Sequence, residues 1–200
     1  MRPTFLDQFP YNAPVFTTVI LLPILVQAVI EGGRRSIRAT VSAANRDPLT
    51  GLLNRRGMQA TFDYLLGKRP SPTTVVVMVA DVDRFKELND AYGHEAGDRT
   101  LQAIADNLFA NTRHDDIAAR IGGDEFMVVA FVDNPDDIAE NNVRIRNAPL
   151  GTHAPGATLS VGIAWSSTDA MDFSFESLTR QADFTLYEVK RARAPRGSAA

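Results

Sequence analysis

From residue 47 to residue 194, the chain alternates between stretches with the apolar spacing of a helix and short, continuous apolar runs. Residues 95–112 place apolar side chains at the i, i+3, i+4, i+7 spacing of a helix that lies on a sheet. Residues 74–80 form an unbroken apolar run rich in valine, which is typical of an inner strand. The alternation therefore predicts a domain in which helices cover a sheet.

A hairpin lies in the middle of this predicted domain. Residues 117–121 and 126–132 flank a Gly-Gly turn, which predicts two antiparallel strands. Helix–strand order with a central hairpin gives a β-α-β-β-α-β sheet covered by helices, an α+β fold of the ferredoxin-like or nucleotide-cyclase type. The other predicted elements are helices at residues 49–66, 135–147 and 173–192 and a strand at residues 158–165.

Residues 13–30 form a long uncharged segment, just long enough for a membrane-spanning helix of about 17–25 residues. Arg34, Arg35 and Arg38 follow it, and the positive-inside rule keeps such residues in the cytoplasm. We therefore expect one membrane helix, with the N-terminus outside the inner membrane and the rest of the chain inside. A secretory signal fits less well, because no small-residue cleavage pattern follows. A buried or dimer-packing helix of a soluble protein is the alternative.

The predicted organisation has four parts. Residues 1–30 hold the membrane helix, residues 31–46 form a cytoplasmic connector helix, residues 47–194 form the folded domain, and residues 195–200 are a tail. Nothing before the connector is large enough to be a sensor domain, so we expect the chain to be a fragment of a longer protein or to pair with other membrane proteins.

The composition of the chain excludes several classes of partner and of reactive site. The net charge of −3 supplies no basic surface, so nucleic acid is not an expected partner. The absence of cysteine excludes disulfides, thiolate nucleophiles and zinc sites built on sulfur. Three scattered histidines make a histidine-rich metal centre improbable.

Acidic side chains stand beside two predicted strands, in residues 79–83 (VADVD) and residues 120–126 (RIGGDEF). Carboxylates held on rigid strand ends can share a hard cation such as Mg²⁺. The two glycines let the backbone turn sharply and approach a bound group closely. Together these features indicate phosphate chemistry.

These motifs resemble the GGDEF family, the diguanylate cyclases, in an ordered series from about residue 47 to residue 193. Gly122 to Phe126 match the signature pentapeptide. The other matching segments are residues 47–56 (DPLTGLLNRR), 81–90 (DVDRFKELND), 93–98 (GHEAGD), 159–164 (LSVGIA) and 182–190.

The resemblance implies a homodimeric enzyme that condenses two GTP into cyclic di-GMP and two pyrophosphates. It implies that Asp81, Asp124 and the Val82 carbonyl bind Mg²⁺, that Asp124 is also catalytic, and that Glu125 helps to deprotonate the attacking hydroxyl. Asp83 is expected instead to cap the following helix.

The same resemblance implies substrate contacts. Asn89 and Asp98 would read the guanine, because an amide and a carboxylate match its donors and acceptors. His94 lies in the same loop and is a further substrate contact. Gly122 and Gly123 have no Cβ, so the substrate can come close to the backbone there. Taken without the resemblance, Asn89 and Asp98 are ordinary residues of a helix terminus and a helix first turn.

Lys190 stands where the family has a phosphate-binding lysine, but the next residues depart from the family pattern. The family usually continues Lys-x-x-Gly-Arg, whereas Ala194 occupies the arginine position here and Arg193 stands one residue early. One residue turns a helix by about 100°, so we expect Arg193 to point elsewhere and GTP binding to be weaker.

Arg113 and Asp116 form the R-x-x-D pattern that binds product and inhibits the enzyme in the family. The alternative is a helix C-terminal arginine followed by a turn aspartate. A second hypothesis for the whole chain is a catalytically silent relative that binds cyclic di-GMP at this pattern and signals through it.

Overall fold

A computed structural model describes Gln27, Glu31 and residues 44–132 and 157–193, and the chain divides into two units, Met1–Ala44 and Asn45–Ala200. In the first unit, Gln27 and Glu31 are helical and the Gln27 amide donates to the Glu31 carboxylate at 2.9 Å. The described residues contain no helix long and apolar enough to cross a bilayer. The predicted membrane helix at residues 13–30 except Gln27, residues 32–43 of the predicted connector and the predicted helix at residues 135–147 lie outside the described residues.

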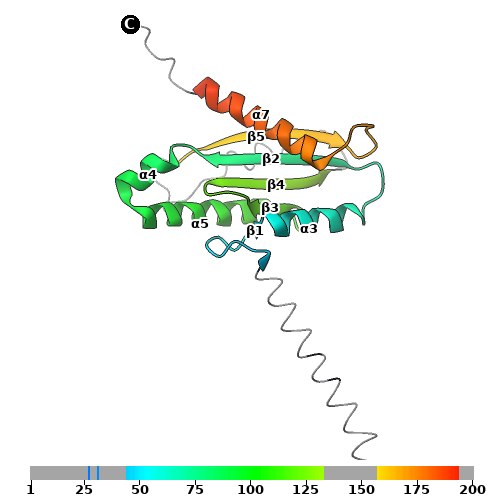
Figure 1. The fold of residues 1–200 in the computed structure, drawn as a ribbon, viewed down its shortest axis with the longest axis horizontal. Helices are drawn as coiled ribbons and strands as arrows, with labels where there is room; N and C mark the ends of the chain where they lie inside the picture. The colour runs from blue at the N-terminus through cyan, green and yellow to red at the C-terminus, as the bar shows by residue number, and fades with distance from the viewer. Residues whose placement is uncertain (1–26, 28–30, 32–43, 133–156, 194–200) are drawn as a thin grey trace, which may run out of the picture. The chain divides into compact units, whose positions relative to one another are not determined.

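Within the described part of the second unit, five strands form one mixed sheet in the order β1-β3-β4-β2-β5 (Figure 1). β1 and β3 are parallel, and all other neighbours are antiparallel. This sheet confirms the predicted α+β fold, including the inner strand, the hairpin and the late strand. The strands are β1 (Leu53–Asn54), β2 (Thr74–Val82), β3 (Ile117–Arg120), β4 (Glu125–Val132) and β5 (Leu159–Ser167).

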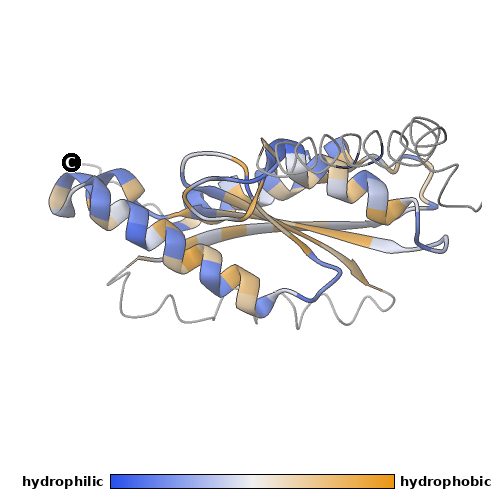
Figure 2. Ribbon diagram, turned by 90° about the horizontal axis from the view of Figure 1, so that it is seen from below, coloured by the Kyte–Doolittle hydropathy of each residue, from blue (hydrophilic) through white to orange (hydrophobic). Residues whose placement is uncertain are grey.

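Helices cover both faces of the sheet. Alternate residues of β2 face opposite ways: Val77 packs with side chains of α3 and α7, whereas Met78 packs with side chains of α5. Apolar residues therefore concentrate in the strands, while each helix mixes polar and apolar positions (Figure 2). The helices are α3 (Arg55–Leu66), α4 (Phe85–Tyr92), α5 (His94–Asn111) and α7 (Phe175–Arg193).

The first predicted helix of the domain, residues 49–66, was placed six residues too early. The helix begins at Arg55, and β1 occupies the two residues before it. Asp47 accepts hydrogen bonds from the Thr50 N–H and hydroxyl, and Gly51 has a φ of 71°, so this segment turns instead of continuing a helix. Asn54 then caps α3 by accepting from the Gly57 N–H at 2.9 Å.

Close contact between α7 and β5 sets the position of the helix over the sheet. A Cβ built on Gly162 would lie 2.2 Å from the Ala182 carbonyl oxygen and 2.3 Å from the Leu186 nitrogen. Only glycine permits this approach. As a result, the C-terminal end of α7 lies at the same end of the sheet as the C-terminus of β2, α4 and the β3–β4 turn (Figure 1).

Candidate active site

The C-terminal end of β2 and the β3–β4 turn place the predicted carboxylates side by side. Asp81 pairs with Glu125 across the sheet, and the Val82 N–H donates to the Asp124 carbonyl at 3.2 Å. The turn closes where the Ile121 N–H donates to the Glu125 carbonyl at 2.9 Å. The fold therefore brings both acidic motifs to one edge of the molecule.

Gly122 makes room for an acidic side chain of the turn. A Cβ built on Gly122 would lie 2.5 Å from Oε2 of Glu125, whereas a Cβ on Gly123 would meet nothing within 4 Å. The first glycine thus lets the Glu125 side chain lie against the backbone, and the second leaves open space beside the backbone. That open space fits the predicted close approach of a substrate.

Asp81 lies in a crowded electrostatic environment. Burial, the strongest influence, raises the pKa of the Asp81 carboxyl, and the neighbouring Asp124 and Asp83 raise it further. Lys190 opposes this rise in pKa because its ammonium nitrogen lies 2.6 Å from Oδ1 of Asp81. Asp81, Glu125 and Lys190 line one cavity of about 390 Å³, open to solvent at this end of the sheet.

The donor set at this edge fits a hard divalent cation. Asp81 and Asp124 offer carboxylate oxygens, which such cations prefer, and the ammonium of Lys190 lies 2.6 Å from Asp81 Oδ1. Within the described residues, no three acidic or histidine side chains converge as a metal cluster. A cation would therefore use these two carboxylates together with backbone and substrate oxygens.

Two charged residues line this cavity for which the sequence predicted no role. Arg55, the first residue of α3, donates to the Ile121 carbonyl at 3.3 Å, and Asp183 faces it from α7. Burial raises the pKa of Asp183, and the charge of Arg55 partly offsets that rise. Both residues lie in segments that resemble the family, but only the fold shows that α3 and α7 meet here.

The predicted helix-capping role of Asp83 is wrong. Arg84, with a φ of 55°, occupies the cap position of α4, and no side chain caps that helix. Asp83 instead accepts from the Ser160 hydroxyl at 2.6 Å and pairs with Arg193 at 3.0 Å. β5 pairs with β2, so the Ser160 hydroxyl is close enough to donate to the Asp83 carboxylate. The spacing of residues in the sequence does not reveal this contact.

The predicted guanine-binding residues lie where α4 meets α5. The amide oxygen of Asn89 is buried and has no hydrogen-bond partner among the described residues. A Cβ built on Gly97 would lie 2.0 Å from that oxygen, so Asn89 lies directly against the residue before Asp98. Asp98 and His94 are exposed on α5. An unsatisfied buried acceptor beside an exposed carboxylate fits recognition of a base with several N–H donors.

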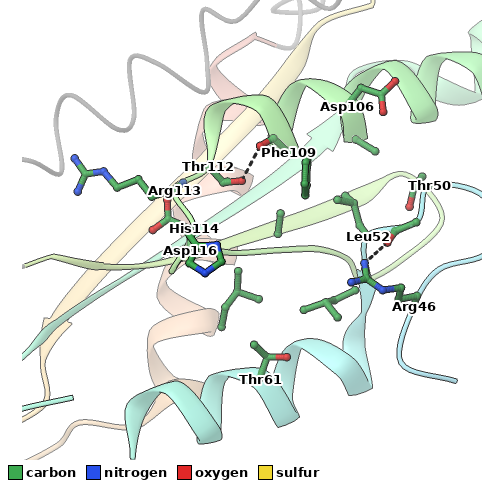
Figure 3. Close-up of a pocket in the computed structure, with 15 residues that line it drawn as sticks. Arg46, Thr50, Leu52, Thr61, Asp106, Phe109, Thr112, Arg113, His114 and Asp116 are labelled. Atoms are coloured by element: carbon green, nitrogen blue, oxygen red, sulfur yellow. Dashed lines mark hydrogen bonds between the residues drawn. The ribbon is translucent and has the colours of Figure 1, made fainter. Parts of the chain in front are cut away.

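The R-x-x-D residues lie at the mouth of a second cavity, of about 470 Å³, between α5, β3 and the segment before α3 (Figure 3). The Asp116 carboxylate accepts from the Arg113 N–H at 2.7 Å and so stabilises the turn, as the structural alternative predicted. The Arg113 side chain projects away from the other labelled residues (Figure 3). Its guanidinium therefore remains available for an anionic ligand while Asp116 shapes the loop.

A partly buried ion pair links the start of the domain to the signature turn. Arg120 pairs with Asp47 at 3.0 Å, and both side chains are less than a fifth exposed. Arg120 also donates to the Gly123 carbonyl through Nε at 3.2 Å and Nη2 at 2.7 Å. Burial would raise the pKa of Asp47, but the Thr50 and Arg120 contacts outweigh it and hold that pKa below its usual range.

Comparison with known proteins agrees with this geometry. Residues 44–196 match the family described as diguanylate cyclase, GGDEF domain. Diguanylate cyclase DgcN of Escherichia coli (strain K12) is 36% identical over 160 residues, which cover 76% of this chain and 38% of DgcN. Cyclic di-GMP phosphodiesterase PdeR of the same strain is 34% identical over 152 residues, 74% of this chain and 22% of PdeR. This chain thus spans less than half of either relative.

A solved structure shows the same fold. The coiled coil and GGDEF domain of DgcB from Caulobacter crescentus, in complex with c-di-GMP, superposes with a TM-score of 0.70 at 26% identity. The match covers 88% of this chain and 96% of that one. With the family match over most of its length, the signature turn beside Asp81 and this shared fold, the chain belongs to the GGDEF family.

Proposed function

We propose that this protein is a diguanylate cyclase. The observation that carries the proposal is the meeting of Asp81, Glu125 and Lys190 around one cavity, with Asp124 in the adjoining turn. Carboxylates that can hold a metal ion and a lysine that can neutralise phosphate charge suit nucleotidyl transfer from GTP. The similarity to DgcN, named as a diguanylate cyclase, supports the same activity.

The reaction joins two GTP molecules through two equivalent steps. In each step, the 3′-hydroxyl oxygen of one GTP bonds to the α-phosphorus of the other, the bond to the leaving pyrophosphate breaks, and the hydroxyl proton departs. Each chain binds one GTP, so two chains face each other as a homodimer. The two steps therefore yield one cyclic di-GMP and two pyrophosphates.

Each cluster of residues has a distinct task. Bound Mg²⁺, held by Asp81, Asp124 and the Val82 carbonyl, would neutralise charge on the phosphates. Lys190 binds a phosphate oxygen, and Glu125 accepts the proton of the attacking hydroxyl. The remaining contacts are to the nucleotide: Asn89, Asp98 and His94 hold the guanine, and Gly122 and Gly123 give the phosphates access to the backbone.

Product inhibition through Arg113 is part of the proposal. The exposed guanidinium beside the second cavity supports it, because Arg can fork two hydrogen bonds to a phosphate or a guanine edge. The complex of the DgcB GGDEF domain with c-di-GMP also supports binding of this ligand. Arg113→Ala should raise the product yield at steady state; an unchanged yield with unchanged product affinity would refute the role.

Incubation of the full chain with GTP and Mg²⁺, followed by nucleotide chromatography, tests the activity. Cyclic di-GMP and pyrophosphate should appear in a ratio of one to two. If GTP stays intact at concentrations that support dimers while cyclic di-GMP binds tightly, the chain is instead a silent receptor. The similarity to PdeR, named as a phosphodiesterase, and the departure at Ala194 favour that second candidate.

We also propose that residues 13–30 tether the protein to the inner membrane, with the GGDEF domain in the cytoplasm. The uncharged segment followed by three arginines supports this placement. The full-length protein should therefore sediment with membranes. Recovery in a high-speed supernatant without detergent would contradict the tether.

A further inference from the structure

A polar cluster joins the C-terminal end of α7 to β2 and β5, beside the proposed GTP site. Arg193 Nη1 lies 3.0 Å from Asp83 Oδ2, 3.2 Å from the Leu159 carbonyl and 3.3 Å from the Ser160 hydroxyl. Asp83 also accepts from the hydroxyls of Thr158, at 2.5 Å, and Ser160, at 2.6 Å. One guanidinium nitrogen thus connects the last described turn of α7 to two strands.

This cluster differs from an ordinary surface ion pair. Exposed pairs contribute little because water competes for both charges. Here the Arg193 side chain is 48% exposed, but Ser160 is fully buried and the Asp83 side chain is only 21% exposed, so three donors hold the carboxylate in one orientation. A network of this kind fixes geometry more firmly than a single contact does.

Lys190 lies between two fixed points of α7. The first is the close contact of Ala182 and Leu186 with Gly162, and the second is the Arg193 cluster. Lys190 follows Leu186 by four residues and precedes Arg193 by three, about one helical turn from each. Movement at either fixed point would therefore carry Lys190 away from Asp81, which it now meets at 2.6 Å.

We propose that Arg193 is a positioning residue that clamps α7 onto Asp83 and thereby holds Lys190 where it binds the triphosphate of GTP. The inference rests on the proposed function, since it assigns Lys190 to the substrate. In this role Arg193 compensates for Ala194 by fixing α7 and not by contacting phosphate, with its Nη1 donating to Asp83, which follows β2, and to the Leu159 carbonyl of β5. Lys190 remains the cation of α7 that meets the ligand.

A double-mutant cycle tests this role. The full-length wild type, Arg193→Ala, Lys190→Ala and the double variant are titrated with guanosine 5′-[α,β-methylene]triphosphate and Mg²⁺, because this analogue cannot release pyrophosphate. Each single variant should bind roughly tenfold more weakly, as expected for loss of one charged contact. The double variant should bind no more weakly than Lys190→Ala alone. If the two losses multiply instead, Arg193 contacts the ligand directly and the proposal is overturned.

Matched variants separate positioning from general damage. Arg191→Ala removes a neighbouring charge of α7 that pairs only loosely with Glu188, at 3.8 Å, and it should leave analogue affinity unchanged. Arg193→Lys should restore part of the lost affinity, and Asp83→Ala should weaken binding as Arg193→Ala does. If Asp83→Ala binds as wild type, the clamp is overturned. If the wild type binds no analogue, the proposed function and this inference fall together.

Discussion

At the scale of single residues, Asp81 carries a negative charge that its surroundings in the folded protein disfavour. The carboxylate is mostly buried and lies near Asp83 and Asp124, and only Lys190 offsets that crowding. The pKa of Asp81 is higher in the folded state than in the unfolded state. The stability that this shift contributes is therefore present below the unfolded pKa of about 3.9, and it is lost as the pH rises through the folded-state pKa. At neutral pH, the ionised site is therefore ready to accept a cation.

Asp81→Asn should keep the fold while losing the reaction. The amide has nearly the same shape but carries no charge, so the melting temperature at pH 7 should equal or exceed that of the wild type. The two proteins should converge in stability as the pH falls through the raised folded-state pKa of Asp81 towards its unfolded value of about 3.9, because wild-type Asp81 becomes protonated. Thermal melts across this pH range check the prediction; a variant that melts far below wild type at pH 7 would contradict it.

The limits of residue-level prediction from sequence are clear at Asp83. The carboxylates of the two motifs could be placed at one edge because each ends or adjoins an apolar run. The partners of Asp83 could not be placed, because Ser160 and Arg193 lie 77 and 110 residues away in the chain. Such contacts depend on which strands are neighbours in the sheet. Local spacing carries no information about that order.

At the scale of elements, two contacts set the positions of the site residues: the Asp47–Arg120 pair beside the signature turn, and the contact of α7 with Gly162. Periodicity predicted most helices and strands well, because their apolar faces are long. It missed β1, which is only two residues long and follows a turn made by Asp47 and Gly51. A short edge strand has too few residues to show a period.

Arg120→Ala should destabilise the domain by about 1–3 kcal/mol, because a largely buried carboxylate loses its charged partner and the Gly123 carbonyl loses two donors. Asp47 has a lowered folded-state pKa, so its stabilisation is present above about pH 3.9 and is lost as the pH falls through the folded value. The difference between variant and wild type should therefore shrink in acid. Denaturant unfolding measures both effects.

Arg180→Ala serves as the control, because it removes an exposed pair with Glu176. This variant should change the free energy of unfolding by under about 0.5 kcal/mol. Equal losses of stability in Arg120→Ala and Arg180→Ala would contradict the prediction.

Gly162→Ala should push α7 away from β5, since the added methyl would overlap the backbone of Ala182 and Leu186. Overpacking of this kind costs about 1–3 kcal/mol. Gly67→Ala is the matched control, because its new methyl would meet its nearest neighbour at 3.4 Å, an ordinary contact. Thermal unfolding should show a loss for the first variant and none for the second. Wild-type stability of Gly162→Ala would show that α7 can shift freely.

At the scale of the whole molecule, the sheet gathers one functional end from distant segments. β2 and the β3–β4 turn bring the carboxylates, α4 and α5 bring the predicted guanine contacts, and α7 brings the cations (Figure 1). The resemblance to the GGDEF family predicted this set, whereas the sequence taken without it left Asn89 and Asp98 as ordinary helix residues. The presence of Arg55 and Asp183 in the cavity could be seen only once α3 and α7 were found to pack on the same face of the sheet.

We propose that Asp81 and the β3–β4 turn bind a divalent cation together with GTP. Electron paramagnetic resonance of unbound Mn²⁺ measures this directly, in the presence of guanosine 5′-[α,β-methylene]triphosphate and the full chain. The wild type should lower the signal of unbound Mn²⁺ below the level that the nucleotide alone sets, whereas folded Asp81→Asn should leave the signal at that level. Equal depletion by wild type and Asp81→Asn would show that the cation binds elsewhere and would contradict the account.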